Sequence, residues 1–370
     1  MPQPAPLILA IDHACLLDRD GIRCAGNKSA GQLGDGHTAK LDCPWGCELA
    51  SDAGCLGYAR CRSNATSVAG ARDAMTVQTD GYRTCALRPA GNVLCWGPNG
   101  DNALRLEPDE ACSPDAKIRC ASTPVDIGLT RIHELAMADG SFCVVDVDRA
   151  VRCTEPSGAV ERTRAGVVDR TPPSFSSLVL TKQAMPPVVS LAAGTYVWCA
   201  TTRDGAIWCR GNAPATPRST DAPVPVTGLD GIQPTQLVVG GAHACVLDGD
   251  GRVWCWGAAH YGGLGHRPVC EAGPCDTAYQ RPALVPGIPK MLRIEAGPSG
   301  TCGIALDRSL WCWGYYARTN LFVPEQMAEK VEWVALGLGR VCWLSDGKLD
   351  CHMGANDGAS DELATLFVSR

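Results

Sequence analysis

The sequence predicts an all-β protein built from seven copies of one unit, a seven-bladed β-propeller. Seven times along the chain, two cysteines stand nine or ten residues apart with a turn sequence between them. Such internal periodicity marks a repeat architecture. Sharing 370 residues among seven units leaves about 53 each, close to a four-stranded blade with its loops. The pairs are Cys15 with Cys24, Cys85 with Cys95, Cys143 with Cys153, Cys199 with Cys209, Cys245 with Cys255, Cys302 with Cys312, and Cys342 with Cys351.

Each cysteine pair is expected to close a β-hairpin. The best-formed copy, residues 241–257, alternates apolar residues around a glycine turn, which is typical of strands and not of a helix. In the last copy the midpoint falls on Asp346-Gly347, a favoured type I′ turn, whereas ten-residue copies place three residues in the loop. Counting outward sets Cys342 opposite Cys351 at a non-hydrogen-bonded position, where Cα atoms lie ~4.5 Å apart, inside the disulfide range of ~4.4–6.8 Å. We therefore predict a disulfide within every hairpin.

Two further strands are expected in each unit. A short apolar strand leads in, as at residues 7–11, 188–192 and 236–240, and a fourth strand with a proline follows the hairpin. Because proline is confined to strand starts and sheet edges, the fourth strands should form the outer rim. They are expected at residues 123–127, 222–226, 281–285, 321–324 and 363–368. Two ways of closing the ring stay open: the first strand completes the last blade, or each unit forms one whole blade.

One domain is expected over residues 1–370, with disulfide-bearing insertions at about 36–66, 106–122 and 266–277. Eleven local pairs would use all 22 cysteines, which favours an oxidising compartment and hence export to the periplasm, the cell surface or the medium. The pairing within the first insertion is open. A zinc site there is the alternative, although only its first two cysteines have zinc-ligand spacing. The insertion cysteines are Cys43, Cys47, Cys55 and Cys61, then Cys112 with Cys120, then Cys270 with Cys275.

Charge and hydropathy narrow the classes of partner. The net charge is −6 and the pI about 5.7, with no run of Lys or Arg, so a nucleic-acid partner is not expected. No segment approaches the ~20 apolar residues of a membrane helix. The short apolar run at residues 7–11 lacks a basic flank, so we expect any export signal or lipid anchor to lie outside this chain.

A known family shares the pattern of the repeat. His13-Ala14-Cys15 with residues 31–34 (GQLG), and residues 241–257 with 262–265 (GGLG), resemble the regulator of chromosome condensation repeat. Members of that family form seven-bladed propellers, and the paired cysteines resemble extracellular bacterial members. The founding member acts in nucleotide exchange and chromatin binding, which an oxidised, acidic chain does not favour. Units three and four depart from the pattern, with Cys153-Thr154 and Cys209-Arg210 where Cys-Trp is expected.

No catalytic residue, cofactor or metal is expected. The chain lacks an H-E-x-x-H motif, a G-x-S-x-G motif and a phosphate-binding glycine loop. The acidic residues at 248–251 have calcium-like spacing but no closing Glu, so a hairpin loop is the better interpretation. His13 and His243 share one repeat position and should be structural hydrogen-bonding groups. Trp96, Trp256 and Trp313 also share one position and should pack between blades.

Aromatic and basic residues outside the repeat pattern are the candidate binding residues, because Tyr, Trp and Arg anchor many interfaces. The sequence thus favours a non-enzymatic exported binding module that recognises a protein, a peptide or a surface polymer through the face bearing the insertions. A lyase or hydrolase with a site at the central channel is the alternative. The candidate binding residues are Trp45, Tyr58, Arg60, His260, Tyr261, Tyr279, Tyr315, Tyr316 and Arg318.

Overall fold

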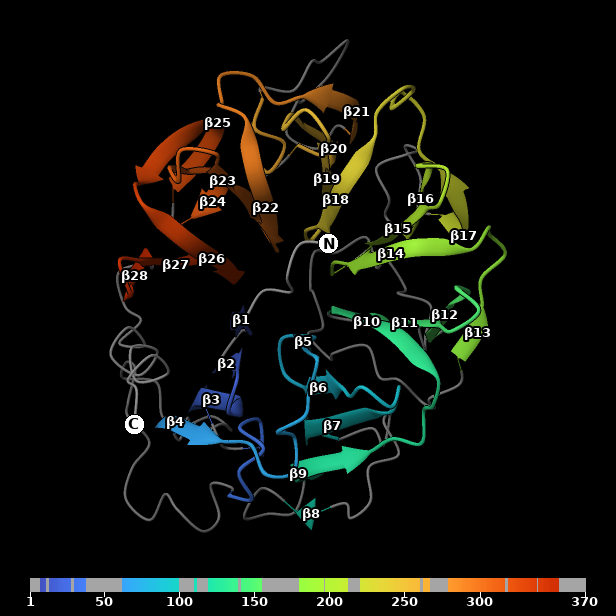
Figure 1. The fold of residues 1–370 in the computed structure, drawn as a ribbon, viewed down its shortest axis with the longest axis vertical. Coiled ribbons are helices and arrows are strands. Elements are labelled where there is room, and N and C mark those ends of the chain that lie inside the picture. The colour runs from blue at the N-terminus through green and yellow to red at the C-terminus, as the bar shows by residue number, and fades with distance from the viewer. Residues whose placement is uncertain are drawn as a thin grey trace, which may run out of the picture.

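The protein forms a ring of seven antiparallel sheets around a central axis (Figure 1). The computed structural model describes residues 7–10, 13–27, 30–37, 62–99, 110–111, 119–138, 141–154, 180–195, 197–211, 220–259, 262–266, 279–316, 319–337 and 339–352. Within these ranges there is no helix, and hence none long and apolar enough to cross a membrane. The predicted all-β, seven-bladed propeller is confirmed.

Strands are numbered in chain order, and each blade runs from an inner to an outer strand. Blade 1 has β1 (Leu7–Leu9), β2 (His13–Asp18), β3 (Gly21–Asn27) and β4 (Arg62–Ser67). Blade 2 has β5 (Thr76–Thr79), β6 (Thr84–Leu87), β7 (Val93–Pro98) and β9 (Arg119–Asp126), with the two-residue β8 (Glu110–Ala111) added at its edge. Blade 3 has β10 (Ile132–Ala138), β11 (Ser141–Asp146), β12 (Val151–Thr154) and β13 (Leu180–Lys182).

The other four blades repeat this order. Blade 4 has β14 (Val188–Ala193), β15 (Val197–Thr202), β16 (Ile207–Gly211) and β17 (Thr220–Pro225). Blade 5 has β18 (Pro234–Val239), β19 (His243–Asp248), β20 (Val253–Ala258) and β21 (Tyr279–Leu284). Blade 6 has β22 (Met291–Gly297), β23 (Gly300–Ala305), β24 (Leu310–Tyr316) and β25 (Thr319–Ala328). Blade 7 has β26 (Val331–Gly337), β27 (Arg340–Ser345) and β28 (Lys348–His352); the expected outer strand at 363–368 lies outside the described residues.

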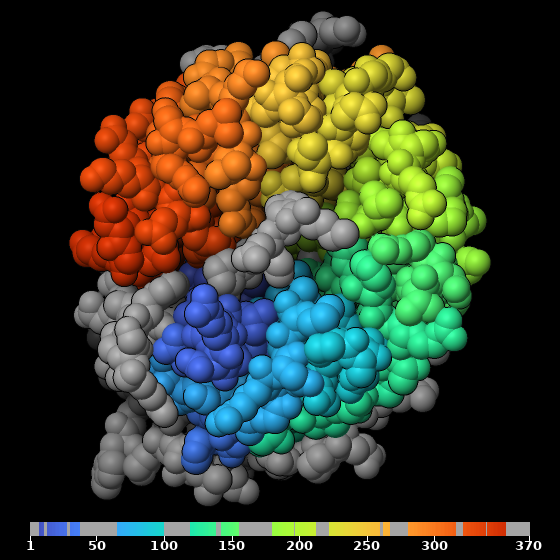
Figure 2. All heavy atoms as spheres, in the orientation of Figure 1, coloured from blue at the N-terminus to red at the C-terminus, as the bar shows by residue number. Residues whose placement is uncertain are grey.

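The ring closes between whole blades. β1 pairs with β2 as the inner strand of blade 1, so each described blade consists of one continuous stretch of chain. Blades 7 and 1 meet through packed side chains, with Trp333 and Ala335 against Leu7 and Leu9. In the space-filling view the blades are consecutive sectors from blue to red (Figure 2). Of the two ways of closing the ring, the structure rules out the one in which the strand at Leu7–Leu9 completes the last blade, because β1 belongs to blade 1.

The predicted hairpin disulfides are confirmed in all seven blades. Each first cysteine faces the second cysteine of its pair directly across the hairpin, with the two Cα atoms 4.0–4.1 Å apart, slightly closer than the sequence predicts. The strands therefore adopt the register predicted from the turn sequences, in which the two cysteines of a hairpin lie opposite each other. The bonded pairs are Cys15 with Cys24, Cys85 with Cys95, Cys143 with Cys153, Cys199 with Cys209, Cys245 with Cys255, Cys302 with Cys312, and Cys342 with Cys351.

The disulfides belong to the apolar core. All of the hairpin cysteines except Cys351 are at most 1% exposed. The core is divided into seven clusters, one between each pair of neighbouring blades, and a disulfide cysteine lies in every cluster. In blades 5 and 6, for example, Cys255 packs with Trp313, and Cys312 packs with Val334 of blade 7. Each disulfide is covalently internal to its blade, yet its sulfur atoms pack in the contact between blades.

In the six blades whose outer strand is described, the second cysteine of the hairpin also lies beside that strand. Cys24 pairs with Thr66 on β4, and Cys95 pairs with Val125 on β9. Cys255 pairs in the same way with Ala283 on β21, and Cys312 with Glu325 on β25. These third strands therefore have a sheet neighbour on both sides, which accounts for the complete burial of their cysteines.

The hairpin turns also connect neighbouring blades. In four blades the left-handed residue of the turn accepts a hydrogen bond from the first residue of the next inner strand. The bonds run from Ile132 to Gly91, Val188 to Arg149, Met291 to Gly251 and Val331 to Arg308, with N···O distances of 2.8–2.9 Å. Blade 5 begins with Pro234, which has no N–H to donate. The turn conformation that sets the cysteine register thus also presents a carbonyl to the following blade.

A glycine two residues after the second cysteine ends the regular pairing with the outer strand. Gly26, Gly97, Gly211, Gly257 and Gly314 have φ between +106° and +116°, a region that side-chain-bearing residues rarely adopt. The outer strand has an irregular register opposite each of them. The prolines of the expected fourth strands lie in or beside these bulges, which confirms their edge position.

Candidate binding face

The strand order gives the propeller two faces that carry different connections between strands. Because every described blade is a consecutive antiparallel sheet, all third strands run the same way and end on one face. We call this face, from which the chain passes to the outer strands, the loop face. The opposite face carries the hairpin turns and the links from outer to inner strands, and we call it the turn face. Each segment expected to hold an insertion lies between a third strand and a fourth strand, and these strands are connected on the loop face.

Three of the sequence-predicted binding residues lie in described strands. Tyr279 begins β21 and pairs with Ala258, and Tyr315 and Tyr316 end β24, so all three lie at the loop-face ends of neighbouring blades 5 and 6. Tyr315 is partly buried, and its backbone N–H donates to Ser299 O over 2.9 Å. The other six candidates lie outside the described residues: Trp45, Tyr58, Arg60, His260, Tyr261 and Arg318.

The insertion cysteines also lie largely outside the described residues. Cys120, on β9, is disulfide-bonded. Cys112, the partner expected from the sequence, is outside the described ranges. The same holds for Cys43, Cys47, Cys55 and Cys61 of the first insertion and for Cys270 and Cys275. The local pairing of these eight cysteines stays a prediction.

Two glycine-rich loops secure the loop face between blades. Residues 31–34 follow β3 within blade 1, and the backbone carbonyl of Gln32 accepts a 2.9 Å hydrogen bond from Trp96 Nε1 of blade 2. The corresponding loop of blade 5 offers Gly263 O to Trp313 Nε1 of blade 6, also over 2.9 Å. Leu33 in the first loop is fully buried. The repeat tryptophans therefore pack between blades, as the sequence predicts.

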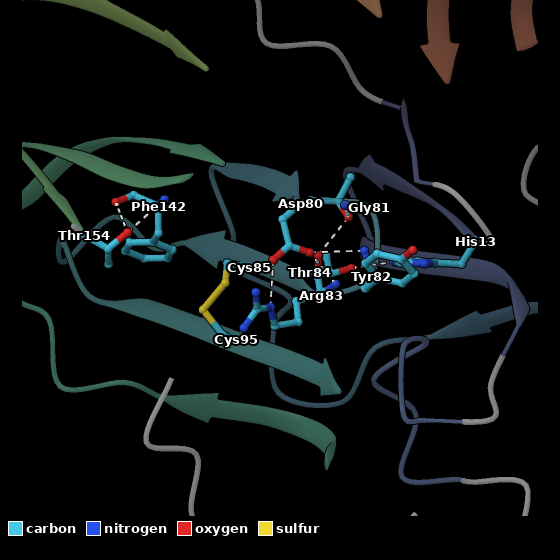
Figure 3. A network of polar contacts seen from close by, with 11 residues as sticks. His13, Asp80, Gly81, Tyr82, Arg83, Thr84, Cys85, Cys95, Phe142 and Thr154 are labelled. Carbon is cyan, nitrogen blue, oxygen red and sulfur yellow. Dashed lines mark hydrogen bonds and ion pairs between the residues drawn. A yellow bond between two sulfur atoms is a disulfide. The ribbon is translucent and has the colours of Figure 1, made fainter. Parts of the chain in front are cut away.

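The two repeat histidines join the same blade pairs. His13 Nε2 lies 2.7 Å from Thr84 Oγ1 across the contact of blades 1 and 2 (Figure 3). His243 Nε2 lies 2.8 Å from Thr301 Oγ1 across the contact of blades 5 and 6. Both imidazoles are at most 4% exposed. The structural role predicted for these histidines is confirmed, since each is buried in a hydrogen bond between blades.

The sequence analysis missed Tyr82, an aromatic residue displayed on the loop face. The turn between β5 and β6 is organised by Asp80, whose Oδ1 accepts from the N–H groups of Tyr82 and Arg83 and whose Oδ2 binds Arg83 Nε at 2.7 Å (Figure 3). Asp80 and Arg83 are buried, whereas Tyr82 is 40% exposed. Only the D-x-x-R spacing signals this turn in the sequence, and it has no counterpart in the other units.

The acidic loop at 248–251 is a hairpin turn, and the Asp248 carboxylate accepts hydrogen bonds from within that hairpin. Asp248 Oδ1 accepts from the N–H groups of Asp250 and Arg252, and Oδ2 binds Arg252 Nε at 2.8 Å and Trp254 Nε1 at 3.2 Å. Burial raises the pKa of Asp248, but these hydrogen bonds outweigh it and hold the pKa below its usual value. Within the described part of the chain, no three His, Cys, Asp or Glu side chains gather as metal ligands would.

The comparisons with known proteins agree with this geometry. Residues 235–262 and 250–304 match the regulator of chromosome condensation (RCC1) repeat. The mitochondrial RCC1 domain-containing protein RUG3 of Arabidopsis thaliana is 30% identical over 144 residues, which cover 37% of this chain and 31% of that protein. The matched stretch thus spans about a third of the relative's length.

Solved structures resemble the whole ring. Yeast RCC1 (Prp20) bound to Kap60 has a TM-score of 0.66 at 16% identity, covering 97% of this chain and 82% of that one. A second study of Prp20p, from Saccharomyces cerevisiae, concerns its binding to Gsp1p and histones. Human WBSCR16 has a TM-score of 0.64 at 16% identity over 88% of this chain and 86% of that chain. The ectodomain of the Physcomitrella patens receptor kinase CR4 has a TM-score of 0.53 at 15% identity over 94% of this chain and 74% of that chain.

The sequence match falls on blades 5 and 6, where the histidine, the glycine-rich loop and the tryptophan make their contacts between blades. The structural likeness extends round the ring. Residues 235–304 of this seven-bladed β-propeller therefore match the RCC1 repeat, and the whole ring shares the fold of RCC1 structures.

Proposed function

We propose that this protein is an exported, non-enzymatic binding module that recognises another protein through its loop face. The observation that carries the proposal is that the repeat residues build the ring, whereas the insertions connect strands on a single face. The repeat residues are committed to the ring, as the buried histidines, tryptophans and disulfides illustrate. The segments that differ in length between units connect strands on one face of that ring, and connecting segments on a rigid scaffold are where binding residues concentrate.

Aromatic residues at loop-face positions support a protein partner. Tyr82 stands on a turn held by Asp80, Tyr279 begins β21 of blade 5, and Tyr315 and Tyr316 end β24 of blade 6. Tyr side chains supply large contact areas at a low entropic cost when their backbone is already fixed. Yeast Prp20, with the same fold, has been crystallised with a protein, Kap60. A peptide or a surface polymer is the alternative ligand for the same face.

Export is the second half of the proposal and rests on the cysteines. Seven disulfides within hairpins are characteristic of oxidising compartments. The CR4 ectodomain has this fold outside the cell, whereas the Arabidopsis relative is mitochondrial. We include in the proposal the extracellular, bacterial type of RCC1 protein that the paired cysteines resemble.

The first experiment replaces the segments expected on the loop face. Residues 40–62 or 266–277 are replaced by short Gly/Ser linkers, and capture of proteins from the native envelope or medium is compared with wild type by mass spectrometry. We expect the ring to stay folded by circular dichroism and capture to be lost. Tyr82→Ala should weaken capture in part, because it removes one aromatic contact. Since the net charge is −6, a captured basic partner should associate more slowly as salt rises.

Matched controls lie on the turn face. Asp250 and Asp346 have side chains 68% and 75% exposed, and each forms a surface ion pair, with Arg252 and Lys330 respectively. Asp250→Asn and Asp346→Asn should leave capture unchanged. If the turn-face variants abolish capture and the loop replacements spare it, the binding face is the opposite one. Turnover of a substrate that depends on a channel residue would favour the enzyme alternative.

The export half has its own test. The native protein is isolated under alkylating conditions, and its thiols are counted after unfolding. We expect all 22 cysteines to be paired. A protein recovered from its cell with most of these thiols free would contradict export, even if the loop face proves to bind a partner.

A further inference from the structure

The free edges of the inner strands are covered, at two places, by a polar side chain from the preceding blade. Gln236 of blade 5 donates from Nε2 to Ile294 O at 2.7 Å and accepts at Oε1 from Ile294 N at 2.9 Å. Its amide thus satisfies both backbone groups of one residue, as a neighbouring strand would. An inner strand has a sheet neighbour on one side only, so these backbone groups have no partner within their own sheet.

Glu134 occupies the same repeat position in blade 3. Gln236 pairs with Leu247 and Glu134 with Val145, each two residues after the first cysteine of its hairpin. Glu134 Oε1 accepts a 3.2 Å hydrogen bond from Leu191 N of blade 4, the residue that corresponds to Ile294. Among the described residues, the corresponding Thr76 hydroxyl and Trp333 Nε1 are buried without a partner. A Gln or Glu at this position is what reaches the backbone of the next blade.

Glu and Gln differ here in whether the side chain can donate a hydrogen bond. The Gln236 amide carries an acceptor and a donor, and both are used. An ionised carboxylate has acceptors only, so Glu134 in that form can bind the Leu191 N–H but not the Leu191 carbonyl. A protonated carboxyl has the same length and the same donor and acceptor pair as the amide. The second bond therefore requires the proton.

We propose that Glu134 is a proton-dependent clamp between blades 3 and 4: when protonated it forms the same two hydrogen bonds to Leu191 that Gln236 forms to Ile294, and when ionised it loses one of them. This inference is independent of the proposed binding function. It predicts a ring that is held more tightly on the acidic side of neutrality, at one defined contact between blades.

The electrostatic surroundings favour protonation. Burial raises the pKa of Glu134 to about 7, against the opposing effects of the Leu191 N–H and the charge of Arg149. Strands β5, β6 and β14, which pack on β10, contribute no ionisable side chain, since Cys85 is in a disulfide. On β11, Asp146 is held by Arg152 Nε at 2.9 Å. On β10 itself, burial and the charge of Arg149 lower the pKa of His133.

The sign of the effect follows from proton binding. Between the ordinary pKa of 4.5 and about 7, the unfolded chain releases the Glu134 proton and the folded protein retains it. The folded state binds more protons in this window, so its stability falls as pH rises. A difference of this size corresponds to a decrease of about 300-fold in the ratio of folded to unfolded protein across the window.

The test compares wild type with Glu134→Gln, which is isosteric and carries the donor at every pH. Hydrogen exchange at the Leu191 amide is measured from pH 5 to pH 8 as a protection factor, with the Ile294 amide as internal reference. We expect wild-type protection at Leu191 to fall with rising pH relative to Ile294, and Glu134→Gln to remove that fall. The wild-type melting temperature should fall more between pH 5 and pH 8 than that of the variant.

The reciprocal variant is Gln236→Glu, which should transfer the pH dependence to Ile294. Identical pH profiles for wild type and Glu134→Gln would overturn the clamp, as would a Glu134 pKa near 4.5 measured by carboxyl NMR. A Gln236→Glu protein whose Ile294 amide shows no pH dependence would also count against it.

Discussion

At the residue scale, buried polar groups are used to hold one blade against the next. The hydroxyls of Thr84 and Thr301 bind the repeat histidines, and Thr301 Oγ1 also donates to Gly263 O at 3.3 Å. Each of these groups is buried, so losing a partner leaves a polar atom without solvent. Such a loss is costlier than removing an exposed hydrogen bond.

A pair of threonines tests this reasoning. Thr301→Val should lower the free energy of unfolding by about 1–3 kcal/mol, because it leaves His243 and Gly263 O without their hydroxyl partner. Thr201, in blade 4, is 5% exposed and its hydroxyl has no partner. Thr201→Val should therefore be neutral or stabilising. Urea denaturation of both variants measures the difference, and equal losses would contradict the role given to the His243 contact.

At the element scale, the glycine two residues after the second cysteine sets the shape of five of the blades. The positive φ of Gly314 lets the end of β24 cross closely over the start of β23, where a Cβ would meet Gly300 Cα and the Ser299 carbonyl. The outer strand β25 bulges at the same level. The sequence shows only a recurring Gly after Cys-Trp; its role in the bulge depends on the neighbouring strands.

Gly314→Ala should therefore be strongly destabilising, by more than about 2 kcal/mol, because both the backbone conformation and the contact oppose a side chain. Gly249→Ala is the matched control in a hairpin turn, since a Cβ there meets nothing within 4 Å. Thermal melting of the two variants distinguishes them. A Gly314→Ala protein as stable as Gly249→Ala would show that the bulge can form without glycine.

At the scale of the whole molecule, the ring depends on the contact between its first and last blades. Among the described residues no strand crosses from one blade to the other, so packing and hydrogen bonds hold this contact. Arg340 of blade 7, 8% exposed, donates from Nη2 to Ala10 O of blade 1 at 2.6 Å. Arg340 occupies the repeat position that His13 holds in blade 1.

Arg340→Leu should loosen this contact, because Ala10 O is left without the donor and blades 1 and 7 have no covalent link through the described strands. We expect faster hydrogen exchange in β1 and β26 than in β14 and β18, and a stability loss of about 1–3 kcal/mol. Arg88→Leu removes an arginine from an ion pair with Asp73 in which both side chains are exposed, and it should cost far less. Exchange that rises evenly in all blades would argue against a weak point at the closure.

The sequence by itself determined the local structure, because its signals act over a few residues. The spacing of Cys342 and Cys351 around Asp346-Gly347 fixed both the turn and the disulfide register, and in the structure Ser345 pairs with Lys348 across that two-residue turn. Seven repetitions of that unit then implied the ring. The shared positions of His13 and His243 were enough to predict a structural role. A residue that recurs at the same position of a repeat is expected to stabilise the fold, whereas a binding or catalytic residue need not recur.

Only the tertiary structure decided what crosses from one blade to the next. The clamp at Glu134, the closure by Arg340 and the carbonyl that Gly91 offers to Ile132 join residues from different units. The periodicity within a unit does not predict which residues of two different units will form a hydrogen bond. Tyr82 became a candidate for the same reason, since its exposure depends on how Asp80 folds the turn against Arg83. Local spacing fixes hairpins, whereas burial and contacts between blades exist only once the ring has closed.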